Sequence, residues 1–582
     1  MVKLPQRPGF RSGLSLLALT LLLSVAAVGW WWQQRDSIER QRLALAEVKR
    51  LQQEMTEPSW HWIDSPVITQ TQTLPWWLAT ADKSTVESVQ AVSFDLRSYD
   101  DAFEEPTEIG NEHLEMHTAF PELQSLKIPR SKIDDEGLVH LASLKRLEVL
   151  DLSDTAITDD GLRHLARLPN LQTLVLDGVQ IDGSGLGQLA SNIRLADLSL
   201  HGVPLQDATF VNALPSLEQV AISSDTLPQL EVTDHPNLRS LSIYAAAAEV
   251  QLARLPLLQT ANVTLSSEES LREFSCIELP ALQRLELRVN AKRADEQARL
   301  ELRDLPRLES LTISASRLAD DFARQILHVP SVTNLAIYGD GTGLGDEVFQ
   351  ALSQLPRLQQ LRLHGTSMTD DGVRELATSE LLEVLFLESA QISDSGIGEL
   401  AALPRLRILG ISGSAGDVDP GPTLSKFPRL EGLHLGACRF PSLTLTGRND
   451  AGDASLDRLR KLTIASETLQ LVTVQSLSSL EDLSLDASVA SEIHIRSLPA
   501  LSRLDISLKP GQDVRAFTLE ALPELRWISL QCGPTGARVP ANIFEHFHTF
   551  GRLRNGIIWG LELPDAARED LRRFREVTGV DF

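Results

Sequence analysis

The sequence predicts an α/β repeat solenoid, a curved arc built from stacked short units with a parallel β-sheet on its concave face. Three observations support this fold class. One pattern, Leu-Pro-x-Leu-x-x-Leu-x-Leu/Ile, returns along most of the 582 residues. Its returns are 20 to 31 residues apart, mostly 20 to 26, as in known solenoids. The segments between the returns have either helical or strand-like apolar spacing, which predicts units of two kinds.

The repeated pattern predicts one short strand per unit. It occurs as LPNLQTLVL (168–176), LPRLESLTI (305–313), LPRLQQLRL (355–363) and LPELRWISL (522–530). Alternating apolar residues lie on one face of a strand, and a single unit cannot bury that face alone. About 18 units stacked over residues 120–534 would form a continuous core.

The second half of each unit predicts whether a helix or a strand lies on the convex side. ITDDGLRHLARL (157–168) and ISDSGIGELAAL (392–403) have helical spacing, so we expect helix-backed units at about 120–193 and 305–427. EVQLARL (249–255) and EIHIRSL (492–498) alternate with period two, so we expect strand-backed units at about 193–279 and 456–522. Because helices are wider than strands, the helix-backed stretches should curve more.

An acidic triplet ending in glycine recurs in the helix-backed units, for example Asp159-Asp160-Gly161. A calcium loop would need more converging oxygen ligands than these two carboxylates provide. We expect Asp159, with Thr158 beside it, to cap the following helix and Asp160 to complement the helix dipole. Gly161 would allow close backbone packing. No metal site is predicted.

The N-terminal region contains a candidate membrane anchor. Residues 13–32 are twenty residues without a charge, and they end in three tryptophans that suit a headgroup interface. A cleaved signal peptide is the alternative, since Val25-Ala26-Ala27 resembles a cleavage site. Lys and Arg flank both sides of the span, so the charge count does not fix the orientation. We expect a single-pass protein whose repeats are exported to the periplasmic side.

The chain thus divides into six predicted segments. The helix after the anchor has a partial apolar stripe, and the charged helix at 566–577 suits a closing cap because Ala567, Leu571 and Phe574 share one face. The segments are a basic tail (1–12), the transmembrane anchor (13–32), a helical stalk (33–57), an N-terminal capping region (58–119), the solenoid (120–534) and a C-terminal cap (535–582).

Composition argues against several functions. The net charge of −25 disfavours nucleic acid as a partner, because an acidic surface repels phosphates. The three cysteines, Cys276, Cys438 and Cys532, are too far apart for a disulfide framework or a zinc motif. No Ser/His/Asp constellation stands out. We predict no enzyme activity, no catalytic residue and no cofactor.

The units resemble bacterial leucine-rich repeats with the consensus Leu-x-x-Leu-x-Leu-x-x-Thr-x-Ile-Thr-Asp-x-Gly-Leu-x-x-Leu, which Leu147–Leu165 match nearly throughout. The anchor and the following QQRDSIERQRLALAEVKRL resemble the front of membrane-anchored leucine-rich-repeat proteins of planctomycete-like bacteria. Units 193–279 and 456–522 depart from the helical consensus. The resemblance implies protein–protein contact without naming a ligand.

Exposed strand positions should form the partner-binding face. Most of them are small or polar, but three consecutive units have larger side chains: Tyr338, Arg362, His364, Phe386 and Glu388. Aromatic and Arg side chains are common interface anchors, although ordinary surface variation would also produce such a group. We expect a membrane-anchored module that binds a protein or envelope component, or alternatively a self-associating spacer of the envelope.

Overall fold

A computed structural model describes two compact units, Met1–Ala245 (unit 1) and Ala246–Phe582 (unit 2). The described residues are 36–50, 67–73, 85–93, 109–266, 271–290, 299–315, 322–339, 345–365, 368–388, 392–413, 419–427, 429–437, 439–447, 456–466, 468–532 and 536–578. The predicted tail (1–12) and anchor (13–32) lie outside them. Within the described residues, no helix has the length and apolar character needed to span a bilayer.

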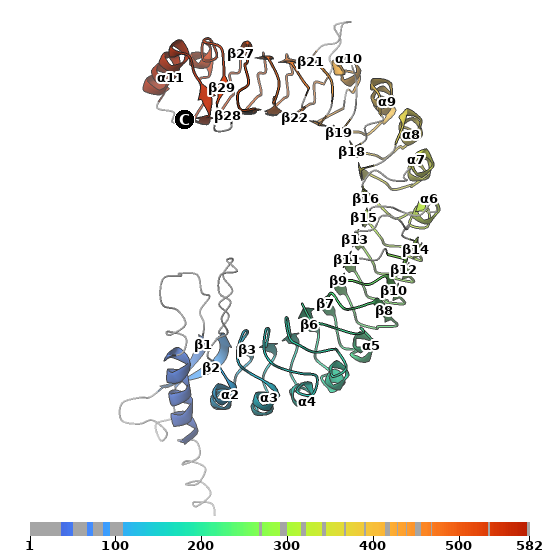
Figure 1. The fold of residues 1–582 in the computed structure, drawn as a ribbon, viewed down its shortest axis with the longest axis vertical. Helices are drawn as coiled ribbons and strands as arrows, with labels where there is room; N and C mark the ends of the chain where they lie inside the picture. The colour runs from blue at the N-terminus through green and yellow to red at the C-terminus, as the bar shows by residue number, and fades with distance from the viewer. Residues whose placement is uncertain are drawn as a thin grey trace, which may run out of the picture. The chain divides into compact units, whose positions relative to one another are not determined.

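Unit 1 contains a sheet that begins with one antiparallel pair, β1–β2, and continues with parallel strands in chain order (Figure 1). Its strands are β1 (Val67–Thr73), β2 (Thr85–Ser93), β3 (Ser125–Lys127), β4 (Val149–Asp151), β5 (Thr173–Val175), β6 (Asp197–His201), β7 (Gln219–Ser224) and β9 (Ser240–Ala245). Each parallel strand comes from one repeat, as the sequence predicts.

The other side of unit 1 has one short helix per repeat until the last. These elements are α2 (Asn111–His117), α3 (Asp135–Leu141), α4 (Leu162–Leu165), the 3₁₀ helix η1 (Leu186–Ser191), α5 (Phe210–Ala213) and then the strand β8 (Gln229–Thr233). A further helix spans residues 36–50, inside the predicted stalk, and buries Ala44 and Val48.

Unit 2 has a long parallel sheet, again with one strand per repeat. Its strands are β11 (Thr260–Leu265), β13 (Arg284–Val289), β15 (Ser310–Ala315), β16 (Asn334–Tyr338), β17 (Gln360–His364), β18 (Val384–Glu388), β19 (Ile408–Ser412), β20 (Gly432–Gly436), β22 (Lys461–Ala465), β24 (Asp482–Asp486), β26 (Arg503–Leu508), β28 (Trp527–Cys532) and β30 (Asn555–Trp559). Below, this is called the long sheet.

The opposite side of unit 2 alternates between strands and helices. Parallel strands β10 (Glu249–Ala253), β12 (Glu273–Ile277) and β14 (Arg299–Arg303) come first. Then follow α6 (Phe322–Ile326), α7 (Asp346–Ser353), α8 (Asp370–Leu376), α9 (Asp394–Glu399), the 3₁₀ helix η2 (Leu400–Ala402) and α10 (Gly421–Leu424). Parallel strands β21 (Ser442–Thr446), β23 (Leu471–Gln475), β25 (Glu492–Arg496) and β27 (Ala516–Glu520) come next. The 3₁₀ helix η3 (Phe547–Thr549), the strand pair β29 (Ala537–Arg538) and β31 (Leu561–Glu562), and α11 (Asp565–Thr578) complete the unit.

The prediction of helix-backed and strand-backed repeats is confirmed, with differences at the borders. Residues 193–214, expected to be strand-backed, contain α5, because Asp207 Oδ1 accepts hydrogen bonds from the Thr209 N–H (2.9 Å) and hydroxyl (2.6 Å) and stabilises a helical turn. Second strands also occur at β14 and β21, outside their predicted ranges. Within unit 2 the repeats backed by α6 to α9 follow a bend with the helices on the outside, whereas those from β20 to β28 run straighter (Figure 1).

The core of each repeat consists of the apolar strand positions. Leu361 and Leu363 on β17, for example, are 0% and 2% exposed, while Gln360 and His364 are not buried. Full burial of a leucine side chain contributes roughly 1.5–3 kcal/mol. Repetition of this pair in successive strands produces a continuous core.

The acidic triplets have a different role from the predicted one. The prediction that Asp159 caps the helix after it is wrong: α4 has no side-chain cap, and Asp159 accepts hydrogen bonds from the N–H groups of Asp182 (2.8 Å) and Gly185 (2.6 Å) in the next repeat. Asp135, Asp346 and Asp370 bind the next repeat in the same way, through the N–H and hydroxyl groups of Thr158, Thr369 and Ser393, respectively. The first acidic residue of the triplets at Asp135, Asp159 and Asp370, and Asp346 at the equivalent position of its repeat, therefore link two repeats.

The triplet glycine accommodates this link. A Cβ atom at Gly161 would lie 2.1 Å from Asp135 Oδ1, and one at Gly396 would lie 2.3 Å from Asp370 Oδ1. Real Cβ atoms do not approach an oxygen so closely, so the aspartate of one repeat requires the glycine of the next. Where a side chain does cap a helix, it is the residue before the triplet: Asp134 caps α3, Thr369 caps α8 and Ser393 caps α9.

Strand-backed repeats use a turn that has no counterpart in the prediction. The residue before the Leu-Pro position has a left-handed backbone in Asp234, Arg254, Glu278, Asp304, Ser476, Ser497 and Ala521, with φ between 54° and 58°. Such a conformation costs a non-glycine residue about 1–2 kcal/mol. It turns the chain from the second strand back toward the first strand of the next repeat, and burial of the following Leu or His offsets its cost.

Candidate functional site

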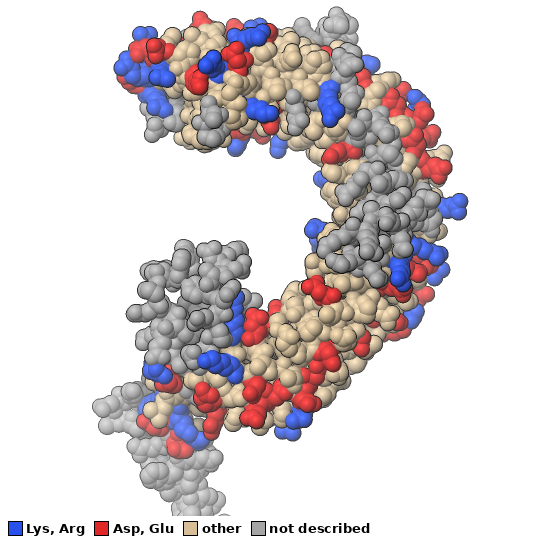
Figure 2. Space-filling model, viewed as in Figure 1, with Lys and Arg blue, Asp and Glu red and all other residues tan. Residues whose placement is uncertain are grey.

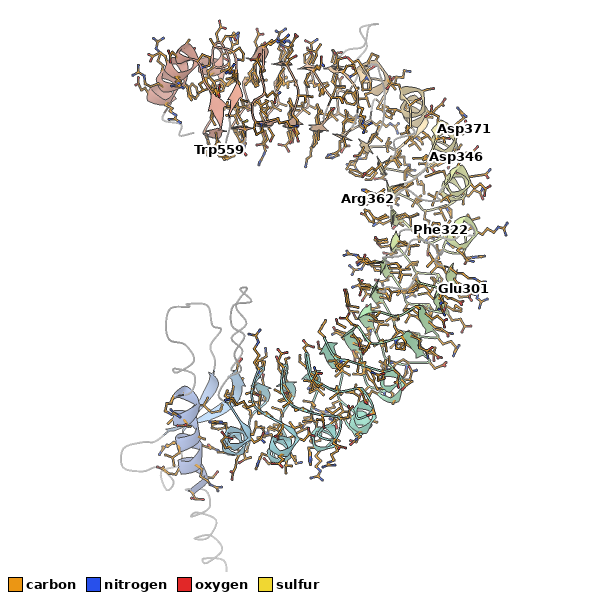
Figure 3. All side chains as sticks on the ribbon, in the orientation of Figure 1. Glu301, Phe322, Asp346, Arg362, Asp371 and Trp559 are labelled. Atoms are coloured by element: carbon orange, nitrogen blue, oxygen red, sulfur yellow. The ribbon has the colours of Figure 1, made fainter. Side chains whose placement is uncertain are left out.

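The predicted patch lies on three neighbouring strands of the long sheet. In the register of β16, β17 and β18, Tyr338 lies beside His364 and Arg362 lies beside Phe386. These positions alternate with the buried ones and face away from the helices. Figure 3 shows Arg362 on the opposite side of unit 2 from Asp346 and Asp371, which belong to α7 and α8.

In the structure, the five predicted side chains form two groups of mutually contacting residues. The Tyr338 and His364 rings have centroids 6.3 Å apart, and His364 Nε2 lies 2.8 Å from Glu388 Oε2. The Arg362 guanidinium lies 5.3 Å above the Phe386 ring centroid, a cation–π arrangement. Tyr338, His364 and Glu388 remain 40%, 50% and 44% exposed, so these side chains are accessible to a partner.

Two further residues belong to the patch and were missed from the sequence. A Cβ atom at Gly410 on β19 would lie 2.1 Å from Phe386 Cδ1, so the Phe386 ring lies over that glycine. There it reaches the His434 ring on β20, with centroids 5.5 Å apart. A glycine at an outward-facing position of a central strand could have indicated this close approach, which buries Gly410. Below, the patch comprises Tyr338, Arg362, His364, Phe386, Glu388, Gly410 and His434.

The patch differs in charge from the rest of the molecule. On the described strands from β16 to β22, the charged side chains on this face are Arg362, Glu388 and Lys461, and Glu388 lies against His364. Burial, and then the charge of Lys461, lower the pKa of His434 and favour its neutral form. The whole chain has a net charge of −25, and acidic side chains are prominent on the helix-bearing sides of the two units (Figure 2).

Unit 1 contains a Ser/His/Asp cluster on its sheet face that the sequence did not reveal. Ser199 donates a hydrogen bond to Asp177 Oδ1 (2.7 Å), and His201 Nδ1 lies 2.9 Å from Ser199 Oγ and 3.3 Å from Asp177 Oδ1. In a catalytic triad the imidazole separates the hydroxyl from the carboxylate. Here the serine proton and one imidazole nitrogen converge on the same carboxylate oxygen. This geometry is a hydrogen-bonded cluster and does not activate a nucleophile.

The cluster predicts a pH-dependent contribution to stability. The hydrogen bond to Asp177 raises the pKa of His201 despite partial burial. Burial favours protonated Asp177, but hydrogen bonds from His201 and Ser199 outweigh it and lower the pKa of Asp177. The His201 contribution is therefore lost as pH rises through its raised pKa, and the Asp177 contribution is lost as pH falls through its lowered pKa. Both stabilising contributions are fully present between about pH 4 and pH 6.5, which are the pKa values of Asp and His in the unfolded chain.

We expect Asp177→Asn to lower the pKa of His201 toward its ordinary value. An NMR titration of the histidine ring carbons, assigned with His201→Gln, measures the change. An unchanged His201 titration in Asp177→Asn would show that the carboxylate does not act on the imidazole.

The family comparison matches one repeat of the chain, and no curated protein sequence matches it. Residues 145–166 match the family model described as Leucine Rich repeat. Among solved structures, a leucine-rich-repeat protein of Leptospira interrogans is similar with 14% identity and a TM-score of 0.37, covering 82% of this chain and 100% of the other. Toll in the Toll–Spätzle complex of Drosophila is 12% identical with a TM-score of 0.43, covering 84% and 83%. An internalin of Listeria monocytogenes is 17% identical with a TM-score of 0.27, covering 61% and 89%.

The repeat pattern and the parallel sheets, with the family match at residues 145–166, show a leucine-rich-repeat fold. Each unit is a solenoid of such repeats. This fold generally serves protein binding or scaffolding.

Proposed function

We propose that this protein is a scaffold that binds a protein partner through the patch on the long sheet of unit 2. The observation that carries the proposal is the convergence of Arg362, Phe386 and His434 from separate repeats. Arg and aromatic side chains are enriched among residues that dominate binding energy. Contacts within the patch orient its side chains before binding, which lowers the entropy cost of association. Arg362 and Lys461 favour a partner segment that has carboxylates beside an apolar residue.

The test is capture of a partner from native membranes by cross-linking with the full-length chain. We expect Arg362→Ala combined with Phe386→Ala to reduce capture on the order of tenfold or more, because truncation of an anchor costs about 2 kcal/mol or more. The matched control is Arg503→Ala combined with Trp527→Ala, because Arg503 lies 5.6 Å above the Trp527 ring centroid on the same sheet. Equal losses in both double variants, or no loss in the first, would reject the patch as the binding site.

We also propose that residues 13–32 anchor the chain in a membrane, with the repeats on the exported, periplasmic side. The uncharged twenty-residue length and the terminal tryptophans support the anchor. Carbonate extraction of membranes and sequencing of the mature N-terminus test it, since a cleaved signal peptide would release a chain that lacks these residues. Protease treatment of intact cells, with and without outer-membrane permeabilisation, tests the side.

A further inference from the structure

The last strand of the long sheet is less covered than the strands before it. β30 pairs with β28 on one side, and among the described strands none pairs with its other edge. Its two core-facing residues, Gly556 and Ile558, are only half-buried, whereas the equivalent Ile528 and Leu530 of β28 are 0% and 1% exposed. On the partner-binding side, Ile557 and Trp559 are 40% and 56% exposed. Figure 3 shows Trp559 at the end of unit 2.

Among the described residues, this edge lacks the usual protection against pairing. Sheet edges are normally blocked by charges, prolines, bulges or a covering element. The sequence of β30 is Asn-Gly-Ile-Ile-Trp, which contains neither a charge nor a proline. The terminal helix α11 instead buries Ala567, Leu571 and Phe574, and the Phe574 ring packs 5.6 Å from that of Phe547. The helix therefore closes the core around η3.

We propose that β30 is a homodimer interface, at which β30 of a second copy pairs antiparallel to it and joins the two long sheets. The backbone supports this pairing. The Asn555 N–H donates to Arg526 O of the same chain, so by alternation Gly556 and Ile558 direct their N–H and C=O groups to the free edge. In the register that pairs all five residues of β30 (Asn555–Trp559) with those of the second copy, Gly556 of each copy exchanges hydrogen bonds with Ile558 of the other. Ile557 then lies on the two-fold axis, opposite itself.

Charge complementarity favours a second copy in this orientation. Arg552, which pairs with Glu524 of its own chain, and Arg554 precede β30, and Glu562, which pairs with Arg538, follows it, so these ends supply an orienting charge pattern and not unpaired charges. Antiparallel pairing places the basic end of one copy against the acidic end of the other, whereas parallel pairing would place like ends together. Trp559 of each copy lies across from Asn555, and no charged residue enters the paired segment. The interface is thus self-complementary, as a two-fold contact requires.

Cysteine cross-linking tests the register. The parent is the full-length chain with Cys438→Ser, in which the other cysteines, Cys276 and Cys532, are buried. Ile557→Cys should form a covalent dimer on mild oxidation, because facing residues of a non-hydrogen-bonded antiparallel pair lie about 4.5 Å apart at Cα, within disulfide reach. Neither Asn555→Cys alone nor Trp559→Cys alone should form a covalent dimer. A mixture of the two variants should form a covalent heterodimer, because Asn555 of one copy faces Trp559 of the other.

Sedimentation of the full-length chain in density-matched detergent tests the interface without cysteines. We expect Ile557→Lys, at an exposed position, to raise the dimer dissociation constant on the order of tenfold or more, since it places like charges opposite each other. Circular dichroism checks that the variant folds. A monomeric parent, or an Ile557→Cys chain that yields no dimer, would overturn the proposal, as would equal cross-linking of all three single variants. Arg362→Ala with Phe386→Ala should leave the Ile557→Cys dimer intact, so this test is independent of the proposed partner site.

Discussion

Replacing Phe349 with alanine is expected to destabilise unit 2 by about 3–5 kcal/mol, the usual cost of truncating a fully buried phenylalanine. Phe349 is on α7 and is 0% exposed. A Cβ atom at Gly372 on α8 would lie only 2.9 Å from Phe349 Cδ2, so the ring fills the space between two successive helices. The cavity left by alanine would therefore loosen the contact between neighbouring repeats.

Amide hydrogen exchange combined with urea unfolding measures this effect, because a repeat array can open locally before it unfolds as a whole. Exchange should accelerate most in α7, α8 and strands β16 and β17. The control is Gln350→Ala, which changes the exposed neighbour on the same helix and should alter stability by less than about 0.5 kcal/mol. A loss below about 1 kcal/mol for Phe349→Ala would mean that the ring does not fill this space.

The second large effect is expected at the aspartate–glycine link between α8 and α9. Asp370→Ala removes hydrogen bonds to the Ser393 N–H (2.9 Å) and hydroxyl (2.5 Å), and should cost about 1.5–3 kcal/mol because the acceptor is charged. Gly396→Ala should cost about 1–3 kcal/mol through the clash of its Cβ atom with Asp370 Oδ1. Combining the two removes the clash and leaves alanine, a better helix former than glycine.

The double variant should therefore be more stable than the sum of the single effects predicts, by on the order of 1 kcal/mol or more. Urea unfolding of the four chains in this double-mutant cycle measures the coupling. A matched pair, Asp135→Ala with Gly161→Ala, has the same geometry in unit 1 and should show coupling of the same sign. Additive losses at both pairs would contradict the steric role of the aspartate.

The repeat and its two kinds of backing could be predicted because they depend on periodicity within one unit. Leu361 and Leu363 must alternate to be buried on one face, and this alternation is visible in the sequence. The border at α5 was mispredicted because Asp207 and Thr209 stabilise a helical turn in a unit whose length suggested a strand. Local side-chain hydrogen bonds of this kind can outweigh unit length.

The candidate patch could be predicted in part for the same reason. Tyr338, Arg362, His364, Phe386 and Glu388 occupy exposed strand positions that the repeat pattern places on one face. His434 lies two strands beyond Phe386, and their contact depends on the absence of a side chain at Gly410. Strand alternation identifies the face of a residue, but the direction of its ring depends on the space its neighbours leave.

The sequence by itself therefore determined a stack of strand-containing leucine-rich repeats, the face of each exposed residue and the two kinds of repeat. Tertiary structure alone decided the contacts between repeats. Asp159 resembles a helix cap within its own unit, yet its carboxylate binds amides of the next. The left-handed residues that end the second strands include Arg254, Ser476 and Ala521, which share no side-chain chemistry. Their conformation results from the stacking of successive repeats, since this stacking supplies the burial that outweighs an unfavourable backbone.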